Sequence, residues 1–481
     1  MTFHVSLVNR TDLSGEIYRQ LRRAIVDGRL RPGDRLPATR HLARSLSVSR
    51  MTVSIAYDRL AGEGFVTSRV GAGTFVSAGL TRTPERKTWA AAAATLRPRP
   101  VWDSVVIPTV FDLPAAFDFR SGLPDGSLFP FASWRRLLAG ELNSGAAASG
   151  PYGDPAGHRG LRAAIVRHIG ISRGMQVSAA DVTITSGTQQ ALDLITRVIL
   201  NSGDQVAVED PGYGPPRQLF RTAGMKVAAV PVDAEGLIVD AIPRNVRAVY
   251  VTPSHQYPLG VAMSLSRRLA LLDWAERNGV AIVEDDYDSE FRFSGRPIEP
   301  VQTLDRSGRV IYVGSFSKTL LPTLRLGFVV TPPSLSQAMR RAKFIADWHT
   351  PLFTQGALAQ FIRDGGFARH LRRMANVYRA RRDLIVRILE QDFADHLELI
   401  SSATGLHLAA SARHGSPERM AAIVNAAMEK GVAIYDLAMF RAAKSARAGL
   451  VLGYGAIPTN RVAEGLSRVR RLFDERSRRR R

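Results

Sequence analysis

The 481-residue sequence contains no cysteine, which excludes disulfides and thiolate metal sites and fits a reducing compartment. It also lacks any run of about 18 apolar residues that could span a bilayer. Met1 to Asp12 lacks the apolar centre of a signal peptide. The ten histidines show no HExxH pair or similar ligand spacing, which predicts no metal site. Together these absences predict a cytoplasmic protein that does not enter a membrane.

Acidic residues are scarce relative to basic ones. Lys and Arg total 65 and Asp and Glu total 43, so the formal net charge is +22. Such an excess favours a polyanionic partner, either nucleic acid or an anionic membrane surface. Because no membrane-spanning run is present, the membrane alternative is the weaker one. A chain of this length also predicts at least two domains.

Three stretches differ in composition, and they predict two domains joined by a linker. Residues 1–78 form an Arg-rich head, in which residues 10–78 hold 12 Arg, no Lys and six acids. Residues 79–113 mix Pro, Arg and an Ala run without periodicity, as linkers do. Residues 114–481 alternate helical segments with short apolar runs, which predicts an α/β domain with a mainly parallel sheet. The runs lie at residues 182–185, 205–210, 247–253, 280–286, 309–315 and 326–330.

The head has the pattern of an α+β winged helix-turn-helix. Apolar periodicity predicts a first helix over residues 15–26 and a second that carries Thr39 to Leu46. Ser49 is a credible N-cap for a third helix over residues 50–61. Residues 65–77 then alternate apolar and polar positions around a Gly-containing turn, which predicts a two-stranded wing.

The start of the third helix would face base edges in a major groove. Arginines elsewhere in the head would hold phosphates or, from the wing, enter a minor groove. The alternative for each arginine is simple solvation of a small domain. Residues 11–78 resemble the GntR family of regulators, through the segment from Gly28 to Val66 and the Gly71 to Phe75 wing. The predicted DNA contacts are Ser49, Arg50, Thr52 and Val53 at base edges, Tyr57 as a backbone contact or packing residue, and Arg35, Arg40, Arg69 and Gly71 around them.

A lysine beside hydroxyls and an arginine marks the second domain. Lys318 ends the run Gly314-Ser315-Phe316-Ser317-Lys318, and Arg325 follows seven residues later. This set suits a Schiff base from Lys318 to an aldehyde that carries a phosphate, with Ser315, Ser317 and Arg325 at the phosphate. Ser186, Gly187 and Thr188 follow a predicted strand and open a helix, so their free amides predict the main phosphate site.

Three adjacent acids, Glu284, Asp285 and Asp286, end the strand before Lys318, and one of them could keep a pyridine nitrogen protonated. From Phe117 onward the chain resembles fold-type I aminotransferases of the aspartate aminotransferase kind, which implies pyridoxal 5'-phosphate and a smaller C-terminal α+β subdomain. The whole chain resembles the MocR-type regulators. The resemblance assigns Asp285 to the ring nitrogen, Tyr287 and His255 to the ring hydroxyl, Tyr213 to stacking on the ring, and Tyr152 to the phosphate of a partner subunit.

The Tyr152 match implies a homodimer, and therefore a double-stranded DNA operator with paired half-sites. For His255, an uncommitted loop position is an equal alternative. The basic tail Arg476 to Arg481 could add nonspecific DNA affinity, but a solvated end is favoured. Binding to DNA would associate the protein with the nucleoid.

Two departures separate the sequence from aminotransferases. Tyr257-Pro258-Leu259-Gly260 lacks the expected asparagine, and residues 450–454 lack the expected carboxylate-binding arginine. Arg217, Arg441 or Arg447 could substitute, although a solvated surface position is favoured for each. The sequence therefore favours a transcription regulator that senses pyridoxal phosphate or an amine reacting with it, and a half-reaction stays open. A working aminotransferase with a DNA-tethering head, and a relic without cofactor, are the alternatives.

Overall fold

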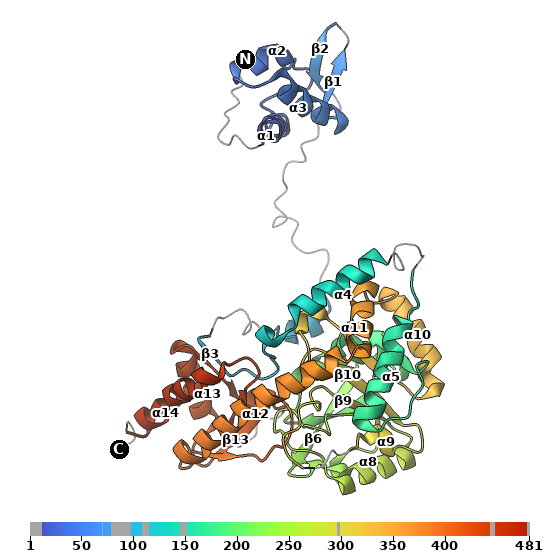
Figure 1. Cartoon of the computed structure of the whole chain (residues 1–481), viewed down its shortest axis with the longest axis vertical. Coiled ribbons are helices and arrows are strands. Elements are labelled where there is room, and N and C mark those ends of the chain that lie inside the picture. Colours follow the sequence, from blue (N-terminus) through green and yellow to red (C-terminus); the bar gives the residue numbers. More distant parts are fainter. Residues whose placement is uncertain are drawn as a thin grey trace. The chain divides into compact units, whose positions relative to one another are not determined.

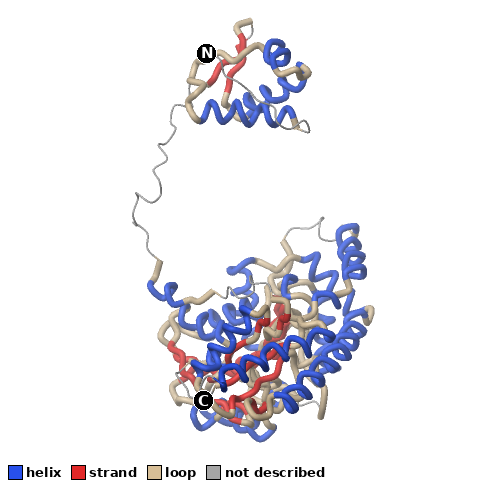
Figure 2. The backbone as a smooth tube through the Cα atoms, turned by 90° about the vertical axis from the view of Figure 1, so that its left-hand side faces the viewer, coloured by secondary structure: helices blue, strands red, loops and turns tan. Residues whose placement is uncertain are grey.

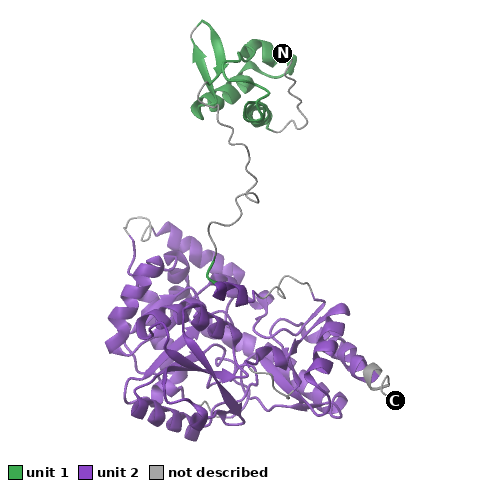
Figure 3. Cartoon of the chain, turned by 180° about the vertical axis from the view of Figure 1, so that it is seen from behind, with its two compact units in different colours: residues 1–99 green, residues 100–481 purple. Residues whose placement is uncertain are grey.

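The computed structural model describes residues 12–69, 71–77, 98–107, 115–144, 152–295, 299–442 and 448–478. The chain divides into two compact units, residues 1–99 and residues 100–481 (Figure 3). Most of the predicted linker, residues 79–113, lies outside the described residues. Its described part includes a short 3-10 helix, η2 (Pro100–Ser104), which belongs to the large unit.

The small unit contains three helices and a β-hairpin in the described residues (Figure 1). The helices are α1 (Leu13–Val26), α2 (Thr39–Ser45) and α3 (Arg50–Gly62), and the strands are β1 (Val66–Arg69) and β2 (Gly73–Val76). The predicted three helices and wing are thus confirmed to within two residues wherever a boundary was given. The Ser49 N-cap is also confirmed, because its hydroxyl accepts a hydrogen bond from the Thr52 amide at 3.0 Å.

A shared core holds these elements together. Ile17 and Leu21 on α1 and Val53 and Leu60 on α3 are no more than 1% exposed and belong to one apolar cluster with the hairpin. The antiparallel hairpin pairs Val66 with Val76, so both inward side chains join that cluster. The small unit therefore has its own core, as an independent domain requires.

The large unit is built on an eight-stranded sheet with the order β4-β11-β10-β9-β8-β5-β6-β7. Only β11 and β7 run antiparallel to their neighbours. The predicted mainly parallel sheet is confirmed, and all six apolar runs form strands; β6 and β7 were not predicted. The strands are β4 (Val182–Thr185), β5 (Gln205–Asp210), β6 (Lys226–Asp233), β7 (Gly236–Leu237), β8 (Val246–Val251), β9 (Ala281–Asp286), β10 (Val310–Ser315) and β11 (Gly327–Val330).

Helices enclose the sheet (Figure 2), which explains why its strands β4, β8, β10 and β11 are almost entirely buried. On one face of the sheet, Val249 and Ile282 pack with Leu271 of α8. On the other face, Tyr250 and Val283 belong to an apolar cluster that includes residues of α6. The helices are α4 (Phe131–Asn143), α5 (Arg159–Arg173), α6 (Thr188–Ile199), α7 (Gly214–Thr222), α8 (Leu265–Asn278), α9 (Val301–Leu304), α10 (Pro333–Asp347) and α11 (Leu352–Arg363).

A smaller subdomain follows the long helix α12 (Gly366–Asp392) and confirms the predicted C-terminal α+β part. Its sheet has the order β12-β13-β16-β15, and β3 (Phe117–Asp118) from the start of the large unit pairs with β14. The remaining elements are β12 (Leu397–Leu399), β13 (His407–Ala412), α13 (Pro417–Glu429), β14 (Val432–Ala433), β15 (Tyr435–Asp436), β16 (Gly449–Gly453) and α14 (Val462–Arg478). None of the helices in the described part of the chain has the length and apolar character needed to cross a bilayer.

Candidate functional site

The carboxyl ends of the parallel strands β4, β8, β9 and β10 meet at one edge of the large sheet. In open α/β sheets this edge is where ligands bind. It brings together Ser186, Asp285 and Lys318, which are far apart in the sequence.

Lys318 follows β10, and its side chain points toward Gly122, near the start of the large unit. Its Nζ donates a hydrogen bond to the carbonyl oxygen of Gly122 at 2.6 Å. Burial lowers the pKa of the Lys318 amine, while the carboxylates of Asp288 and Asp285 oppose that shift. A lowered pKa increases the fraction of neutral amine, which is the nucleophilic form that attacks an aldehyde.

Asp285 lies near the end of β9, and only one of its two carboxylate oxygens has a hydrogen-bond partner in the described residues. Its Oδ2 accepts a hydrogen bond from the Tyr250 hydroxyl at 2.7 Å, whereas its Oδ1 is buried without a partner in the described residues. Burial raises the pKa of Asp285 to about 7. An unpartnered buried carboxylate oxygen fits a protonated pyridine nitrogen, which would supply both the missing hydrogen bond and a compensating charge.

The predicted phosphate site lies at the start of α6. Gly187 caps this helix with φ +83° and offers no side-chain cap, so the first helical amides face outward without one. A Cβ on Gly187 would lie 2.8 Å from Nη2 of Arg325, which donates to the Ser186 carbonyl at 2.8 Å. Helix amides and a guanidinium therefore converge, and this arrangement fits a phosphate.

The two predicted serines lie on the same turn as Lys318. The Ser315 hydroxyl accepts a hydrogen bond from the Ser317 amide at 3.1 Å, which orders the segment before the lysine. Ser315 is buried and Ser317 is half-buried. Ser315 is the last residue of β10, and Ser317 lies between that strand and the lysine.

The rings of three tyrosines, Tyr213, Tyr257 and Tyr287, pack against one another. The ring of Tyr257 lies 5.4 Å from that of Tyr213 and 6.0 Å from that of Tyr287. The Tyr257 hydroxyl is 2.7 Å from Oγ of Ser121. Tyr257, which stands where aminotransferases carry an asparagine, thus packs with these two tyrosines, and its hydroxyl forms a hydrogen bond with Ser121.

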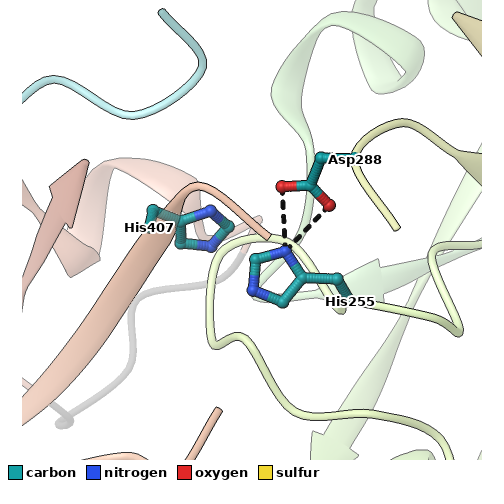
Figure 4. A group of neighbouring side chains, drawn as sticks. All are labelled: His255, Asp288 and His407. Carbon is teal, nitrogen blue, oxygen red and sulfur yellow. Dashed lines mark hydrogen bonds and ion pairs between the residues drawn. The ribbon is translucent and has the colours of Figure 1, made fainter. Parts of the chain in front are cut away.

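His255 belongs to a buried polar cluster with Asp288 and His407 (Figure 4). The His255 Nδ1 lies 3.0 Å from Asp288 Oδ1, and the Tyr287 hydroxyl donates to the His255 carbonyl at 2.8 Å. The His407 Nε2 lies 3.1 Å from the Pro258 carbonyl. Ligand atoms of the three side chains lie within 4.8 Å of one another. A metal ion would have to displace the His255–Asp288 hydrogen bond, so this geometry favours a polar network over a metal centre.

Tyr152 packs with residues outside the set described above. Its side chain is 72% exposed and its ring stacks on Trp348 at 4.3 Å.

The expected carboxylate-binding arginine is also absent from β16 in three dimensions, since this strand is buried and apolar. Arg217 differs from the sequence interpretation. It is 8% exposed, and its Nη1 is buried without a partner in the described residues, so the solvated-surface reading was wrong for it. Burial lowers the pKa of Arg217. Arg447 lies outside the described residues.

In the small unit, Arg50 at the start of α3 is exposed, as are Ser49, Arg40 and Arg35. The Arg69 guanidinium lies 5.4 Å from the Phe75 ring centre in the wing, and Gly71 takes φ +76° in the wing turn. Thr52, half-buried, bonds to Ser49 through Oγ1 at 2.8 Å.

One predicted base contact is wrong, and for a second residue the packing alternative holds. Val53 is fully buried and packs in the core of the small unit, so it cannot face a base. Tyr57 is 6% exposed and its hydroxyl donates to the Pro37 carbonyl at 2.8 Å, which makes it a packing residue. Both point inward because they lie one turn apart on the apolar face of α3.

Sequence reasoning missed four residues of the large site: Gly122, Tyr250, Asp288 and His407. Tyr250 could have been predicted, since it lies near the end of the strand next to the one carrying Asp285. Gly122 and His407 come from segments without a local motif, and only the tertiary fold brings them to Lys318 and His255.

Comparison with known proteins places both units in families. Residues 13–76 match the model of bacterial regulatory proteins of the gntR family, and residues 123–451 match that of aminotransferase class I and II. The solved structure of a kynurenine aminotransferase from Pyrococcus horikoshii aligns with a TM-score of 0.70 and 30% identity, over 79% of this chain and 96% of that one. The fold match and the fitted side chains support pyridoxal 5'-phosphate as the cofactor of the large unit.

Full-length relatives combine both units. The probable rhizopine catabolism regulatory protein MocR of Rhizobium meliloti is 37% identical over 95% of this chain and 93% of its own length. The pyridoxine biosynthesis transcriptional regulator PdxR of Corynebacterium glutamicum is 30% identical over 93% and 92%. The chain therefore belongs to the MocR-type subfamily of GntR transcription regulators, in which a DNA-binding helix-turn-helix unit is fused to an aminotransferase-like unit.

Proposed function

We propose that this regulator binds pyridoxal phosphate at Lys318 and changes its hold on DNA when that cofactor, or an amine reacting with it, occupies the large unit. Residues 1–78 read DNA, residues 114–481 bind cofactor and effector, and residues 79–113 connect them. The observation that carries the proposal is the unpartnered, buried Oδ1 of Asp285 in the same site as Lys318. Operator binding associates the protein with the nucleoid.

Each residue of the large site has a defined task. When bound, pyridoxal phosphate supplies an aldehyde for amines and an electron-withdrawing ring. Lys318 would hold the aldehyde through its amine, and Asp285 would keep the ring nitrogen protonated. The amides at the start of α6 and Arg325 hold the phosphate, with Ser186, Gly187, Thr188, Ser315 and Ser317 lining that end. Tyr213 stacks on the ring, while Tyr287 and His255 lie toward its hydroxyl.

Sensing is favoured over turnover by two features of this site. Tyr257 stands in place of the asparagine, and β16 offers no arginine for a substrate carboxylate. Transfer between substrates needs a held carboxylate and a positioned base, whereas amine capture needs only Lys318 and the aldehyde. The names of two relatives, which refer to rhizopine catabolism and pyridoxine biosynthesis, support an amino compound or the vitamin itself as effector.

A homodimer completes the proposal. Tyr152 is exposed beside a stretch of exposed apolar side chains on α10, where Phe344 is 42% exposed and Ile345 is 75% exposed. A second copy covering this surface would shield it and let Tyr152 reach the partner's phosphate. A dimer carries two DNA-binding units, which predicts an operator with paired half-sites.

The test is DNA binding by the full chain. Its affinity for the DNA upstream of its own gene is measured by fluorescence anisotropy, with and without pyridoxal phosphate. We expect a sequence-selective complex whose affinity changes with the cofactor. Absence of any selective complex in both conditions would defeat the proposal.

A working aminotransferase is the second candidate, because the phosphate site and Lys318 are intact. Enzymes of ordinary efficiency turn over about 1–1000 times per second. Steady-state transfer to a keto acid in that range would favour the enzyme, whereas a single half-reaction would agree with sensing.

A further inference from the structure

One buried cation of the large unit has no part in the site described above. Only six of the 65 basic residues are lysines, so the chain uses arginine almost everywhere. Lys343 on α10 is nevertheless a lysine and is fully buried. A buried ammonium is costly unless every one of its protons finds an acceptor.

The surroundings of Lys343 meet that condition. Its Nζ donates to Gln190 Oε1 at 2.7 Å, to Thr350 Oγ1 at 3.0 Å and to Asp347 Oδ2 at 2.8 Å. Three acceptors match the three protons of an ammonium group, whereas the wide planar fork of an arginine would not fit this arrangement.

Two of these acceptors lead directly to the phosphate site. Gln190 Oε1 also accepts a hydrogen bond from the Ser186 amide at 2.8 Å. Thr350 Oγ1 lies 3.4 Å from Oγ of Ser186. The ammonium of Lys343 is therefore one residue away from Ser186 along two separate paths.

The same Ser186 carries the other half of the phosphate site, since its carbonyl accepts from Arg325. Its amide is turned toward Gln190 and its carbonyl toward the guanidinium, so hydrogen bonds hold the backbone of Ser186 on both sides of its Cα. With that backbone fixed, the next amides at the start of α6 stay aimed at the space in front of Gly187.

We propose that Lys343 is a positioning residue for the phosphate group of the cofactor, acting through Gln190 and Thr350 on the Ser186 turn. The inference rests on the proposed cofactor site and assigns a role there to a residue that never touches the ligand. A purely structural lysine would instead support the fold equally for any ligand.

The experiment separates these roles by comparing two aldehydes, pyridoxal phosphate and pyridoxal, which lacks the phosphate. Dissociation constants are measured from the visible absorbance of lysine-bound aldehyde in the full chain and in Lys343→Met. We expect the constant for pyridoxal phosphate to rise by about tenfold, the scale of one charge-assisted hydrogen bond, and that for pyridoxal to stay within about twofold. The exposed Lys226→Met is the matched control, with both constants unchanged.

A second variant guards against a folding defect. Gln190→Met keeps the Lys343–Asp347 pair but removes the acceptor that joins Lys343 to the Ser186 amide, together with the Gln190–Asp347 hydrogen bond. The same selective loss is expected, and retained pyridoxal binding shows that the variant is folded. Equal weakening of both aldehydes in both variants, or no weakening of either, would overturn the inference. A wild-type chain that binds neither aldehyde would overturn the proposed function itself, and the inference with it.

Discussion

The two units place their functional groups in opposite environments. In the small unit, the side chains proposed to meet DNA, such as Arg40 and Arg50, are exposed on a core that they do not enter. In the large unit, Asp285 is 2% exposed and His255 is 1% exposed. The candidate contacts of the small unit therefore lie on its surface, whereas the candidate site residues of the large unit lie in its interior.

Because of this difference, substitutions in the two units should have different effects on binding and on stability. Removing an exposed arginine takes away a contact with DNA and leaves the core intact. Removing a buried charged group such as Asp285 changes both the site and the cost of folding, because burial has raised the pKa of that carboxyl group.

The largest effect is expected for Lys318→Ala. Because only an amine can attach the aldehyde covalently, the visible absorbance of bound pyridoxal phosphate should vanish. DNA affinity without cofactor should stay within about twofold, since the small unit has its own core. Spectrophotometry and anisotropy on the same preparation check both parts. An absorbance that survives in the variant would refute the role of Lys318.

Arg50→Ala should weaken specific DNA binding by about 1–3 kcal/mol, the scale of a base contact. The melting temperature should not change, because Arg50 is exposed. Arg244→Ala, an exposed arginine of the large unit, is the control. A loss that is the same on every DNA sequence would show that Arg50 contacts phosphate and not a base.

Asp285→Asn should alter the pH dependence of stability in the cofactor-free protein. Burial raises the pKa of Asp285 from 3.8 to about 7, so the folded state binds more protons than the unfolded state between those values. Stability therefore falls as pH rises from about 4 to about 7, and the asparagine removes that contribution. Calorimetry at about pH 5 and about pH 8 should show a smaller difference in melting temperature for the variant. The exposed Asp240→Asn should keep the wild-type difference.

The smallest effect is expected for Arg69→Ala in the wing. A phosphate contact should weaken all DNA sequences alike and lower the slope of log affinity against log salt by about one. Titrations at several salt concentrations measure that slope. A change confined to one sequence would instead place Arg69 in a groove.

Much of the fold could be predicted from the sequence because local patterns carry it. The Val/Ile runs form the sheet, and the Ser49 cap with its apolar periodicity marks α3. The antiparallel direction of β11 could not be predicted, because an apolar run looks the same whichever way the strand runs in the sheet. The half-exposed β6 escaped detection because its side chains do not form a continuous buried run.

Among the site residues, those next to a strand end or in a motif could be predicted, such as Lys318, Asp285 and Gly187. Val53 was misplaced because the helix start predicts which turn meets DNA but not which side of that turn faces the core. Gly122 and His407 depend on how the smaller subdomain packs against the sheet edge, which no local pattern encodes.

The central claim is that cofactor and DNA binding are coupled in one chain, and coupling must be reciprocal. The most direct measurement is the DNA dissociation constant with and without pyridoxal phosphate, together with the pyridoxal phosphate dissociation constant with and without operator DNA. The account predicts the same factor in both directions, about five- to 150-fold, and its loss in Lys318→Ala. A factor of one in both directions would show that the two units act independently and would contradict the account.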